Sequence, residues 1–439
     1  MSSIGVGLVG WGTVGCGVIQ ALRENGDVIA DRLGFPIELK RVADLDITRP
    51  RPVAVPAELL TTSIDDILDD PSIQIVIELV GGLGVAKTVI TRALEKGKYV
   101  VTANKALLAH HGNELFEIAR KNGVAIGFEA SVGGGIPLIK ALREGLAGNK
   151  IRTLFGILNG TCNYILTRMT EEGLSFEDVL KEAQAKGYAE ANPSLDVDGI
   201  DTAHKLAIAS ALSFGTPIQF DDVYTEGISR IDPVDIEFGQ EFGYLLKMLA
   251  IARCVDGRLE MRVHPTFIRR DHVLAGVRGA YNALFINGNA VGNVMLYGMG
   301  AGMMPTGSAV VADLMDIARD IKSGTPGRIP SLSFLPERLR SVEIKPMADI
   351  STSYYFRFSA VDSPGVLSKI SGILGQNRIS IAAVIQKGRE VEGGVPIVML
   401  THEALESDVQ KALSEIDQLD MVLAPIQIIR IENQDAETA

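Results

Sequence analysis

The opening segment of this chain constrains its fold more than any other feature of the sequence. An apolar run from Ile4 to Val9 leads into a glycine-rich turn and then into an amphipathic helix. Gly10, Gly12 and Gly15 match the spacing G-x-G-x-x-G. The first glycine permits a tight turn, the second lets the backbone approach a pyrophosphate, and the third lets the helix pack close to the strand. We therefore predict a dinucleotide-binding domain at the start of the chain.

The strand expected at residues 38–46 ends in two acidic residues, Asp44 and Asp46. An acidic side chain at this strand end usually binds the adenosine ribose hydroxyls and favours NAD, whereas a nearby arginine can accept the additional phosphate of NADP. Asp44 argues for NAD, Arg49 and Arg51 argue for NADP, and all of these charges can also be solvated turn residues. The sequence leaves the preference between NAD and NADP open.

Three further strand patterns, at residues 71–82, 98–109 and 122–137, alternate with helical patterns. Such alternation indicates a parallel, doubly wound α/β sheet, in which ligands bind at the carboxyl ends of the strands. Thr102, Asn104 and Lys105 come at such an end. Lys105 can be an ordinary solvated helix start, but its position beside the expected nicotinamide crevice predicts a role in the site.

The bulk composition narrows the class of protein and its partners. The chain has 439 residues, of which 46% are hydrophobic and 22% charged, and its formal net charge is −12. This length allows two or three domains, and the acidic charge argues against a nucleic-acid partner or an anionic membrane surface. No apolar run is long enough for a membrane span, and the start lacks the features of a signal peptide. Cys16, Cys162 and Cys254 form no metal or disulfide pattern, so we expect a reducing cytoplasm.

The segment GYAEANPSLDVDGIDTAHKL, residues 187–206, places charged residues directly before an apolar helix. We predict that this helix includes Asp198, Asp201 and Lys205, whose spacings of three and four put them on one face. An ordinary surface ion pair is the simplest interpretation, but the rest of the helix is too apolar to be largely exposed. With Glu190 on the preceding loop, these groups are expected to form a polar pocket for a zwitterionic substrate.

Two neighbouring residues invite a catalytic interpretation. His204 precedes Lys205 but falls on a different helical face, so we expect it to pack rather than to act as a base. Cys162, in the string NGTCNY, raises the possibility of a thioester-forming nucleophile. No histidine pairs with it in sequence, and free cysteines usually behave as small buried hydrophobes, so a structural role is expected.

Six strings, taken in order, resemble homoserine dehydrogenase: GLVGWGTVG, VTANKALLA, FEASVGGGIP, GILNGTCNYIL, GYAEANPSLDVDGIDTAHKLAIAS and YGMGAGMMPTGSAVVADL. The resemblance covers the chain up to about residue 322. It implies reversible interconversion of L-homoserine and L-aspartate 4-semialdehyde with NAD or NADP. Many relatives carry an arginine just before the acid at the end of the second strand. This chain has Ala43 there, so a firm NADP preference does not carry over.

The same resemblance implies roles for individual residues. Lys205 matches the acid/base residue that carries the hydroxyl proton, and Lys105 matches a second catalytic lysine that faces cofactor and substrate. Substrate-binding matches are Glu190, Asp201 and Gly160. Cofactor-binding matches are Gly10, Gly12, Thr13, Val14, Gly15, Asp44, Thr102, Lys105, Gly187, Glu190 and Gly302. Glu129 matches a monovalent cation site, with sodium expected, together with the carbonyls of Val132, Gly134 and Ile136. A flexible turn is the alternative interpretation of that glycine-rich stretch.

Residues 323–348 are rich in proline, glycine and serine, which predicts a linker. The pattern that follows, strand–helix–strand–strand–helix–strand, resembles an ACT domain, with DSPGVLSKI at its first strand-to-helix turn. The resemblance implies that paired modules bind a small amino acid, with feedback by L-threonine expected and Asp362 and Gly365 as contacts. A module that serves assembly alone is the alternative. We also expect a homodimer or homotetramer.

We therefore expect a three-part α/β architecture. Residues 1–134 form a Rossmann-like doubly wound domain completed by about 303–322, residues 135–302 an α+β substrate and dimerisation domain, and residues 349–439 the ACT domain after the linker. A phosphoglycerate-type dehydrogenase would need an arginine and a His–Glu pair that we cannot identify here. A non-catalytic sensor of amino acid and dinucleotide also stays open, and NAD(P)-dependent oxidation of homoserine would distinguish it from the enzyme.

Overall fold

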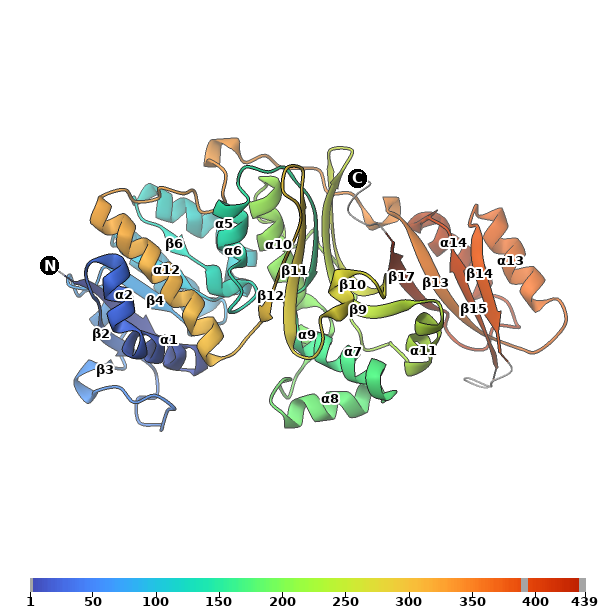
Figure 1. Cartoon of the computed structure of the whole chain (residues 1–439), viewed down its shortest axis with the longest axis horizontal. Coiled ribbons are helices and arrows are strands. Elements are labelled where there is room, and N and C mark those ends of the chain that lie inside the picture. Colours follow the sequence, from blue (N-terminus) through green and yellow to red (C-terminus); the bar gives the residue numbers. More distant parts are fainter. Residues whose placement is uncertain (1–2, 388–393, 434–439) are drawn as a thin grey trace.

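The computed structural model describes residues 3–387 and 394–433, so the expected domain ranges extend slightly beyond it at both ends and at the 388–393 segment. The molecule is elongated, and its three parts follow one another in chain order (Figure 1). A parallel sheet with helices on its faces forms one end, a large mixed sheet the middle, and a small α/β module the other end. The predicted α/β class is confirmed.

The N-terminal sheet has six strands in the order β3-β2-β1-β4-β5-β6, all parallel. This is the doubly wound order in which the chain reverses beside the first strand, where such folds bind dinucleotides. The expected strand at 122–137 is only two residues long, because the backbone turns into a 3-10 helix at Glu129–Ser131. The strands are β1 (Ile4–Val9), β2 (Ile37–Ala43), β3 (Leu60–Thr61), β4 (Ile75–Glu78), β5 (Tyr99–Thr102) and β6 (Ile126–Gly127).

The helices of this domain are α1 (Thr13–Glu24), α2 (Gly26–Leu33), α3 (Asp65–Leu68), α4 (Gly84–Glu95), α5 (Lys105–Lys121) and, far later in the sequence, α12 (Met303–Ser323). Figure 1 shows α12 lying alongside α1 and α2. The approach is close because small residues face each other. A Cβ atom on Gly17 would lie 1.9 Å from the carbonyl oxygen of Met303, and one on Gly307 would lie 2.6 Å from the carbonyl carbon of Gly17. The late helix therefore packs directly against the first domain.

The middle part is built on β7, β9, β10, β11 and β12, with helices packed against the sheet. Its helices are α6 (Leu138–Lys140), α7 (Gly160–Glu172), α8 (Phe176–Ala185), α9 (Ser194–Val197), α10 (Ile200–Phe214) and α11 (Pro233–Glu241). Its strands are β7 (Ile151–Ile157), β8 (Tyr224–Thr225), β9 (Tyr244–Val255), β10 (Arg258–Arg269), β11 (Tyr281–Gly288) and β12 (Gly292–Met299).

The C-terminal module has the predicted strand–helix–strand–strand–helix–strand order, with one additional two-residue strand. Its elements are β13 (Ser351–Ala360), α13 (Val366–Gln376), β14 (Ile381–Gln386), β15 (Val395–Thr401), β16 (Ala404–Leu405), α14 (Glu406–Ile416) and β17 (Gln427–Glu432). Strand β17 pairs in parallel with β10, so the module continues the middle sheet, which runs β12-β11-β7-β9-β10-β17-β13-β15-β14. One continuous sheet thus joins the two parts.

The segment predicted as a linker packs against the rest of the molecule. Leu332 is buried, and Arg340 donates its backbone N–H to the carbonyl of Gly215 at the end of α10. Further along, Ile344 forms a parallel bridge with Leu259 at the start of β10. The segment is irregular, as its composition predicts, but it lies along α5 and α10 instead of extending freely.

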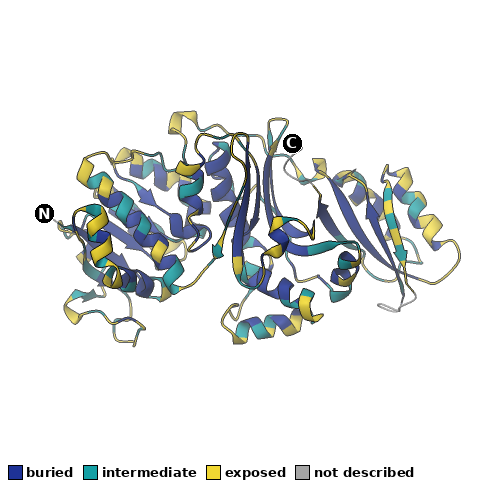
Figure 2. Ribbon diagram, in the orientation of Figure 1, coloured by how far each residue is buried: buried dark blue, intermediate teal, exposed yellow. Residues whose placement is uncertain are grey.

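Helix α10 is buried along nearly its whole length, because α5 of the first domain packs on it and the middle sheet lies behind it. Figure 2 shows most strands of both sheets as buried, whereas the edge strands β12 and β14 and the outer helices carry exposed residues. No helix in the described part of the chain is both long and apolar enough to cross a bilayer.

Candidate active site at the interface of two domains

The glycine-rich turn has the geometry that a phosphate cradle requires. Gly10 adopts φ 105°, and a Cβ there would lie 2.6 Å from the carbonyl carbon of Leu79. A Cβ on Gly15 would lie 2.3 Å from the carbonyl oxygen of Gly10, whereas nothing lies within 4 Å of the Cβ position at Gly12. Gly12 is also the N-cap of α1, where no side chain caps the helix. The first amides of α1, including Thr13 and Val14, thus remain available for an anion.

Asp44, directly after β2, is held in several contacts. Its Oδ2 accepts from the backbone N–H of Trp11 in the glycine turn at 2.7 Å, and its Oδ1 pairs with Arg51 at 3.3 Å. The Arg51 guanidinium also lies 5.7 Å from the centre of the Trp11 ring. The acidic and basic residues that argue for different cofactors therefore sit in one cluster beside the turn.

A cavity of about 350 Å³ lies between the first domain and the middle part. Its walls come from the start of α1, the ends of β4 and β5, the loop before α9, and α10. The lining residues are Val14, Glu78, Leu79, Gly81, Gly82, Ala103, Asn104, Lys105, Ala106, Glu190, Asn192, Leu195, Asp196, Asp201 and His204. The cavity thus joins the cradle to the charged segment that the sequence predicts as a substrate pocket.

An ion triad crosses the domain boundary at this cavity. The Asp201 carboxylate, on α10, accepts from Lys205 at 2.6 Å and from Lys105, the first residue of α5, at 3.0 Å. Burial alone would raise the pKa of Asp201, but the ammonium groups of Lys205 and Lys105 bring it well below its usual range. The charge of Asp201 raises the pKa of Lys105 in turn.

Lys205 lies one hydrogen bond behind Asp201. Its side chain is 10% exposed, and its ammonium also donates to the carbonyl of Leu158 at 2.6 Å. Lys205 does not itself line the cavity, whereas Lys105 and Asp201 do. Both lysines predicted as catalytic are therefore adjacent to the same carboxylate, with Lys105 nearer the opening and Lys205 deeper.

A second acid, Asp196 on α9, extends the network. Asn159, the N-cap of α7, donates from Nδ2 to Asp196 at 2.7 Å and to Asp201 at 2.8 Å. Thr161 also donates to Asp196, at 3.2 Å, and burial raises the pKa of this carboxyl. One amide therefore positions two carboxylates, and the network links α7, α9 and α10.

The predicted helix start is wrong by two residues, which changes the membership of the cluster. Gly199 adopts φ 86° and separates α9 from α10, which begins at Ile200. Asp198 is the residue after α9, is exposed, and does not share the face of Asp201 and Lys205. Asp196 takes the place that the helical spacing assigned to Asp198.

His204 and Cys162 pack as structural residues. The His204 ring lies 4.5 Å from Phe220 and 5.4 Å from His110, measured between ring centres, and burial lowers the pKa of His204 to about 4. The Cys162 thiol is fully buried and donates to the carbonyl of Asp196 at 3.1 Å. Burial raises the pKa of this thiol well above its usual range, which disfavours the reactive thiolate.

The other predicted residues divide into two groups. Thr102 ends β5 and donates to the buried carboxylate of Glu78 at 2.7 Å, Gly160 begins α7 beside Asn159, and the exposed Glu190 lines the cavity. Gly187, after α8, and Gly302, the N-cap of α12, do not line it. Glu78 has a pKa raised by burial and was not expected from the sequence.

The predicted cation residues include one buried carboxylate, Glu129. Glu129 accepts from the backbone N–H groups of Ile139 and Lys140, both at 2.8 Å. Burial and the nearby Asp313 raise the pKa of Glu129 to about 7. Within the described residues Glu129 has no ion-pair partner. Among the described residues, none donates a hydrogen bond to the carbonyls of Val132 and Gly134. The carbonyl of Ile136 accepts one from the backbone N–H of Leu138.

Main-chain carbonyls and one carboxylate are the kinds of donor that a hard cation prefers, so the residue types fit the group. The described part of the chain holds no cluster of three or more His, Cys, Asp or Glu that would suit a transition metal.

The two predicted regulatory residues lie at the turn between β13 and α13. Asp362 and Gly365 are both exposed, and Gly365 is the N-cap of α13 with φ 93°. In Figure 1, α13 lies at the opposite end of the molecule from α1 and the glycine-rich turn.

Comparisons with known proteins give the same family along the chain. Models described as the homoserine dehydrogenase NAD-binding domain, homoserine dehydrogenase and the ACT domain match residues 10–129, 137–315 and 354–420. The chain is 46% identical to homoserine dehydrogenase of Neisseria gonorrhoeae, over 99% of each chain. A crystal structure of a homoserine dehydrogenase from Thiobacillus denitrificans matches with TM-score 0.94 and 47% identity, over 99% of each chain.

A second solved structure is more distant. A hyperthermophilic archaeal homoserine dehydrogenase in complex with NADPH matches with TM-score 0.60 and 25% identity, over 77% of this chain and 100% of that one.

The ion triad predicts a specific loss of stability. Asp201→Asn leaves two ammonium groups facing a neutral amide, so we expect a loss of about 3 kcal/mol in the free energy of unfolding at pH 7. Asp198→Asn, three residues away and exposed, is the matched control and should change it by less than about 0.5 kcal/mol. Because the pKa of Asp201 is lowered, the difference between wild type and Asp201→Asn should shrink as the pH falls below about 4. Equal stability of the two variants in urea titrations at pH 7 would contradict the triad.

Proposed function

Because this chain belongs to the homoserine dehydrogenase family, we propose that it interconverts L-homoserine and L-aspartate 4-semialdehyde in the cavity between its first two domains. The observation that carries the proposal is the ion triad of Lys105, Asp201 and Lys205, which stands where the dinucleotide cradle and the charged loop meet. NAD or NADP, when bound, exchanges a hydride with the substrate carbon that bears the oxygen. The protein must then move one proton at that oxygen.

The residues of the site suit that proton transfer. In the reductive direction an ammonium group donates the proton as the carbonyl oxygen gains charge, and in the oxidative direction the neutral amine accepts it. We assign this role to Lys205, which Asp201 and the Leu158 carbonyl hold in one orientation. Lys105, on the cavity wall, is assigned to orient the substrate oxygen and the cofactor, while Asp196 and Glu190 supply negative charge for the substrate ammonium.

Removing the Lys205 amine tests this assignment. Lys205→Ala should lower kcat for reduction of the semialdehyde by roughly 100- to 10,000-fold, the usual contribution of a positioned acid or base. The Kd of the cofactor, measured by fluorescence titration, should change less than about threefold, because Lys205 lies behind Asp201 and away from the cradle. His204→Ala, at the neighbouring position, should retain kcat within about tenfold. A Lys205→Ala variant with near-wild-type kcat would contradict the assignment.

We further propose that the enzyme accepts both NAD and NADP. Asp44 supports ribose binding by NAD, and Arg51, which pairs with it, supports binding of the additional phosphate of NADP. The archaeal relative was solved with NADPH. Arg51→Gln should therefore reduce kcat/KM for NADPH several-fold more than for NADH. An equal reduction for both cofactors would refute the role of Arg51.

A monovalent cation, sodium being the first choice, is proposed at Glu129. A cation there would favour the ionised carboxylate, so its binding should release a proton and tighten as the pH rises through about 7, the pKa of Glu129. Sodium titrations against choline chloride, followed by calorimetry at pH 6 and pH 8, measure this. Glu129→Gln should abolish the sodium-specific heat. Sodium binding that is the same at both values of pH would exclude Glu129 as a ligand.

We propose that the C-terminal ACT module binds L-threonine and inhibits the enzyme from a distance. A buried ion pair offers the physical route. Arg430 on β17 pairs with Glu406 of its own module at 2.7 Å and with Glu226 of the middle part at 2.9 Å. The loop that carries Glu226 touches the catalytic segment: Ile228 donates its N–H to the carbonyl of Val197 at 2.8 Å. Val197 follows Asp196 directly, so a shift of β17 can reach the catalytic acids.

A matched pair of variants tests this route. Arg357 crosses the same boundary in another buried ion pair, with Asp235 on α11, at 2.7 Å. Arg430→Met and Arg357→Met each break a buried pair and should destabilise the protein comparably. Only Arg430→Met is expected to change KM for the substrate and to weaken threonine inhibition, by about fivefold or more. If threonine never inhibits the wild type, the regulatory proposal fails. If both variants alter inhibition equally, the route through Glu226 fails.

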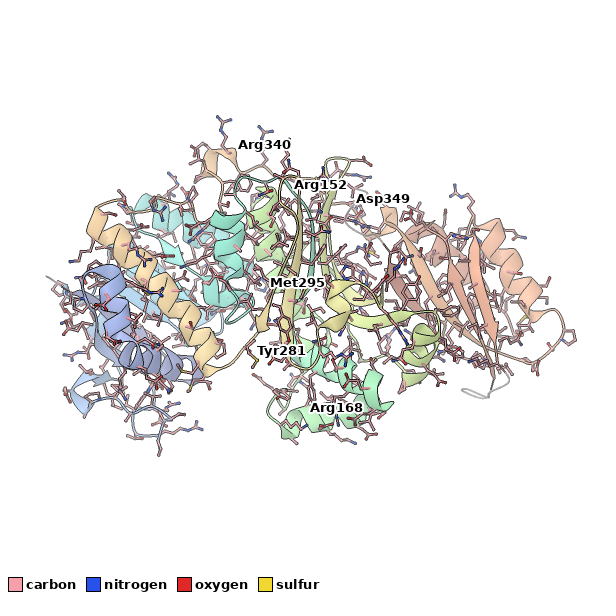
Figure 3. The ribbon with its side chains drawn as sticks, viewed as in Figure 1. Arg152, Arg168, Tyr281, Met295, Arg340 and Asp349 are labelled. Atoms are coloured by element: carbon pink, nitrogen blue, oxygen red, sulfur yellow. The ribbon has the colours of Figure 1, made fainter. Side chains whose placement is uncertain are left out.

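Finally, we propose that the chain forms at least a dimer through the exposed edge of its middle sheet. Strand β12 ends the sheet, and Tyr297, Met295 and Met299 on it are exposed beside Tyr281 on β11, with the two tyrosine rings stacked 5.1 Å apart. Figure 3 labels two of these exposed residues, Tyr281 on β11 and Met295 on β12. An exposed apolar edge strand favours association. Tyr297→Lys should give a smaller species in light scattering, and an unchanged mass would contradict this interface.

A further inference from the structure

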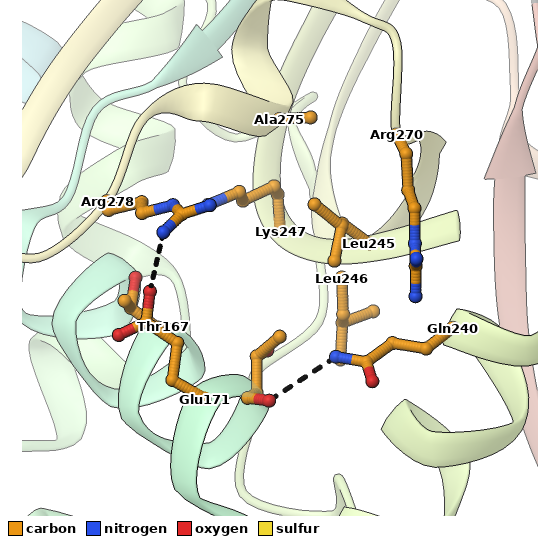
Figure 4. A pocket seen from close by; sticks show the side chains of 10 residues that line it. Thr167, Glu171, Gln240, Leu245, Leu246, Lys247, Arg270, Ala275 and Arg278 are labelled. Atoms are coloured by element: carbon orange, nitrogen blue, oxygen red, sulfur yellow. Dashed lines mark hydrogen bonds and ion pairs between the residues drawn. The ribbon is translucent and has the colours of Figure 1, made fainter. Parts of the chain in front are cut away.

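A second cavity, of about 390 Å³, lies on the middle part away from the ion triad (Figure 4). It is enclosed by the C-terminal half of α7, the end of α11, the start of β9 and the segment between β10 and β11. The lining residues that matter for its chemistry are Glu171, Gln240, Lys247, Arg270 and Arg278. None of these residues takes part in the catalytic cluster.

The central feature of this cavity is a buried lysine without a carboxylate partner. Lys247 lies on β9, between Leu246 and Met248, and is 4% exposed. Its ammonium donates to the carbonyl of Val277 at 2.5 Å and to Asn163 Oδ1 at 3.3 Å, and both acceptors are neutral. A buried ion usually requires a counter-charge, because desolvation costs several kcal/mol. The described residues supply none within ion-pair distance of Lys247.

The remaining charges make the cavity positive. Arg278 pairs with Glu171, the one carboxylate of the lining, at 3.2 Å, and both are exposed. Arg270 stands on the opposite side in Figure 4, and its guanidinium has no partner within the described ranges. The lining therefore carries a net charge of about +2, because three basic side chains, Lys247, Arg270 and Arg278, face the single carboxylate of Glu171. Gln240 adds an amide with a second N–H that can donate to an anion, whereas the hydroxyls of Thr167 and Thr170 already donate to the α7 carbonyls of Asn163 and Leu166.

We propose that this cavity binds a small dianion, a phosphate ester or a dicarboxylate, with Lys247 as the buried anchor and Arg270 as the second contact. The charge excess matches two negative charges, and an arginine fork suits both phosphate and carboxylate oxygens. The cavity is large enough for a small metabolite. The pKa of Lys247 supports the assignment. Burial, and then the charge of Arg278, lower this pKa to about 8, and a bound anion would offset both effects by favouring the charged ammonium.

The test is a calorimetric titration of the full-length protein with inorganic phosphate and, separately, with succinate, at constant ionic strength set by sodium chloride. Titrations are repeated with saturating NADPH, so that the cradle of α1 is occupied and cannot take phosphate. We expect saturable binding of at least one dianion under these conditions. Lys247→Met and Arg270→Gln should each weaken it by roughly tenfold or more, the usual loss of a charge-assisted contact. Arg340→Gln, which removes an exposed arginine elsewhere, should not.

Two further readouts separate a ligand anchor from a structural lysine. Lys247→Met should leave the melting temperature in chloride buffer unchanged or raised, because an unpaired buried charge has been replaced by an apolar side chain of similar size. Binding to the wild type should weaken as the pH rises through about 8, since of the groups facing the ligand, Lys247, Arg270, Arg278 and Glu171, the lysine loses its charge there.

Phosphate binding without succinate binding would identify the ligand as a phosphate compound, and the reverse would identify a dicarboxylate. Absence of saturable binding of either dianion to the wild type would overturn the proposal. So would binding that Lys247→Met leaves unchanged.

Discussion

The Asp201 carboxylate accepts from two ammonium groups that belong to different domains, and the geometry of the candidate active site depends on this arrangement. Lys105 begins α5 of the dinucleotide-binding domain, and Lys205 stands on the same helix as Asp201 in the middle part. Two cations so close together would repel each other, and the buried acid makes their proximity favourable. Asn159 then fixes the acid itself, because its amide also donates to Asp196. The charged loop, the α7 N-terminus and the cofactor domain are thus joined through one group.

The rest of the architecture supports this cluster in rigid elements. Helix α10 carries Asp201 and Lys205 and is buried between α5 and the middle sheet, so neither residue can move far without disturbing the core. The middle sheet continues into the ACT module through the pairing of β10 with β17. An ACT module attached through a continuous sheet and buried ion pairs can transmit small displacements, whereas one on a flexible linker could not. Residues 323–348, which precede the ACT module, pack against α10 and β10, so they are not a flexible linker.

Much of the fold and part of the site could be predicted from the sequence, because those features have local causes. The glycine spacing, the β5 end with Lys105, and the Asp201–Lys205 spacing each follow from short-range geometry. The predicted helix start is wrong because the apolar pattern does not reveal the positive φ of Gly199, so the sequence predicts Asp198 where Asp196 stands. Glu78 is predictable in the same way as Thr102, because each is the last residue of a parallel strand and ligands bind at the carboxyl ends of such strands. Pairing of β17 with β10, and the burial of Lys247, depend on tertiary contacts with no local signal.

The account rests on Lys205, and not the more accessible Lys105, carrying the proton. A crystal structure of the full-length enzyme with oxidised cofactor and L-homoserine measures this most directly. We predict that the Lys205 nitrogen lies about 3 Å from the substrate hydroxyl oxygen while it keeps its contact with Asp201. A complex in which Lys205 still donates to the Leu158 carbonyl and only Lys105 reaches the hydroxyl would contradict the account.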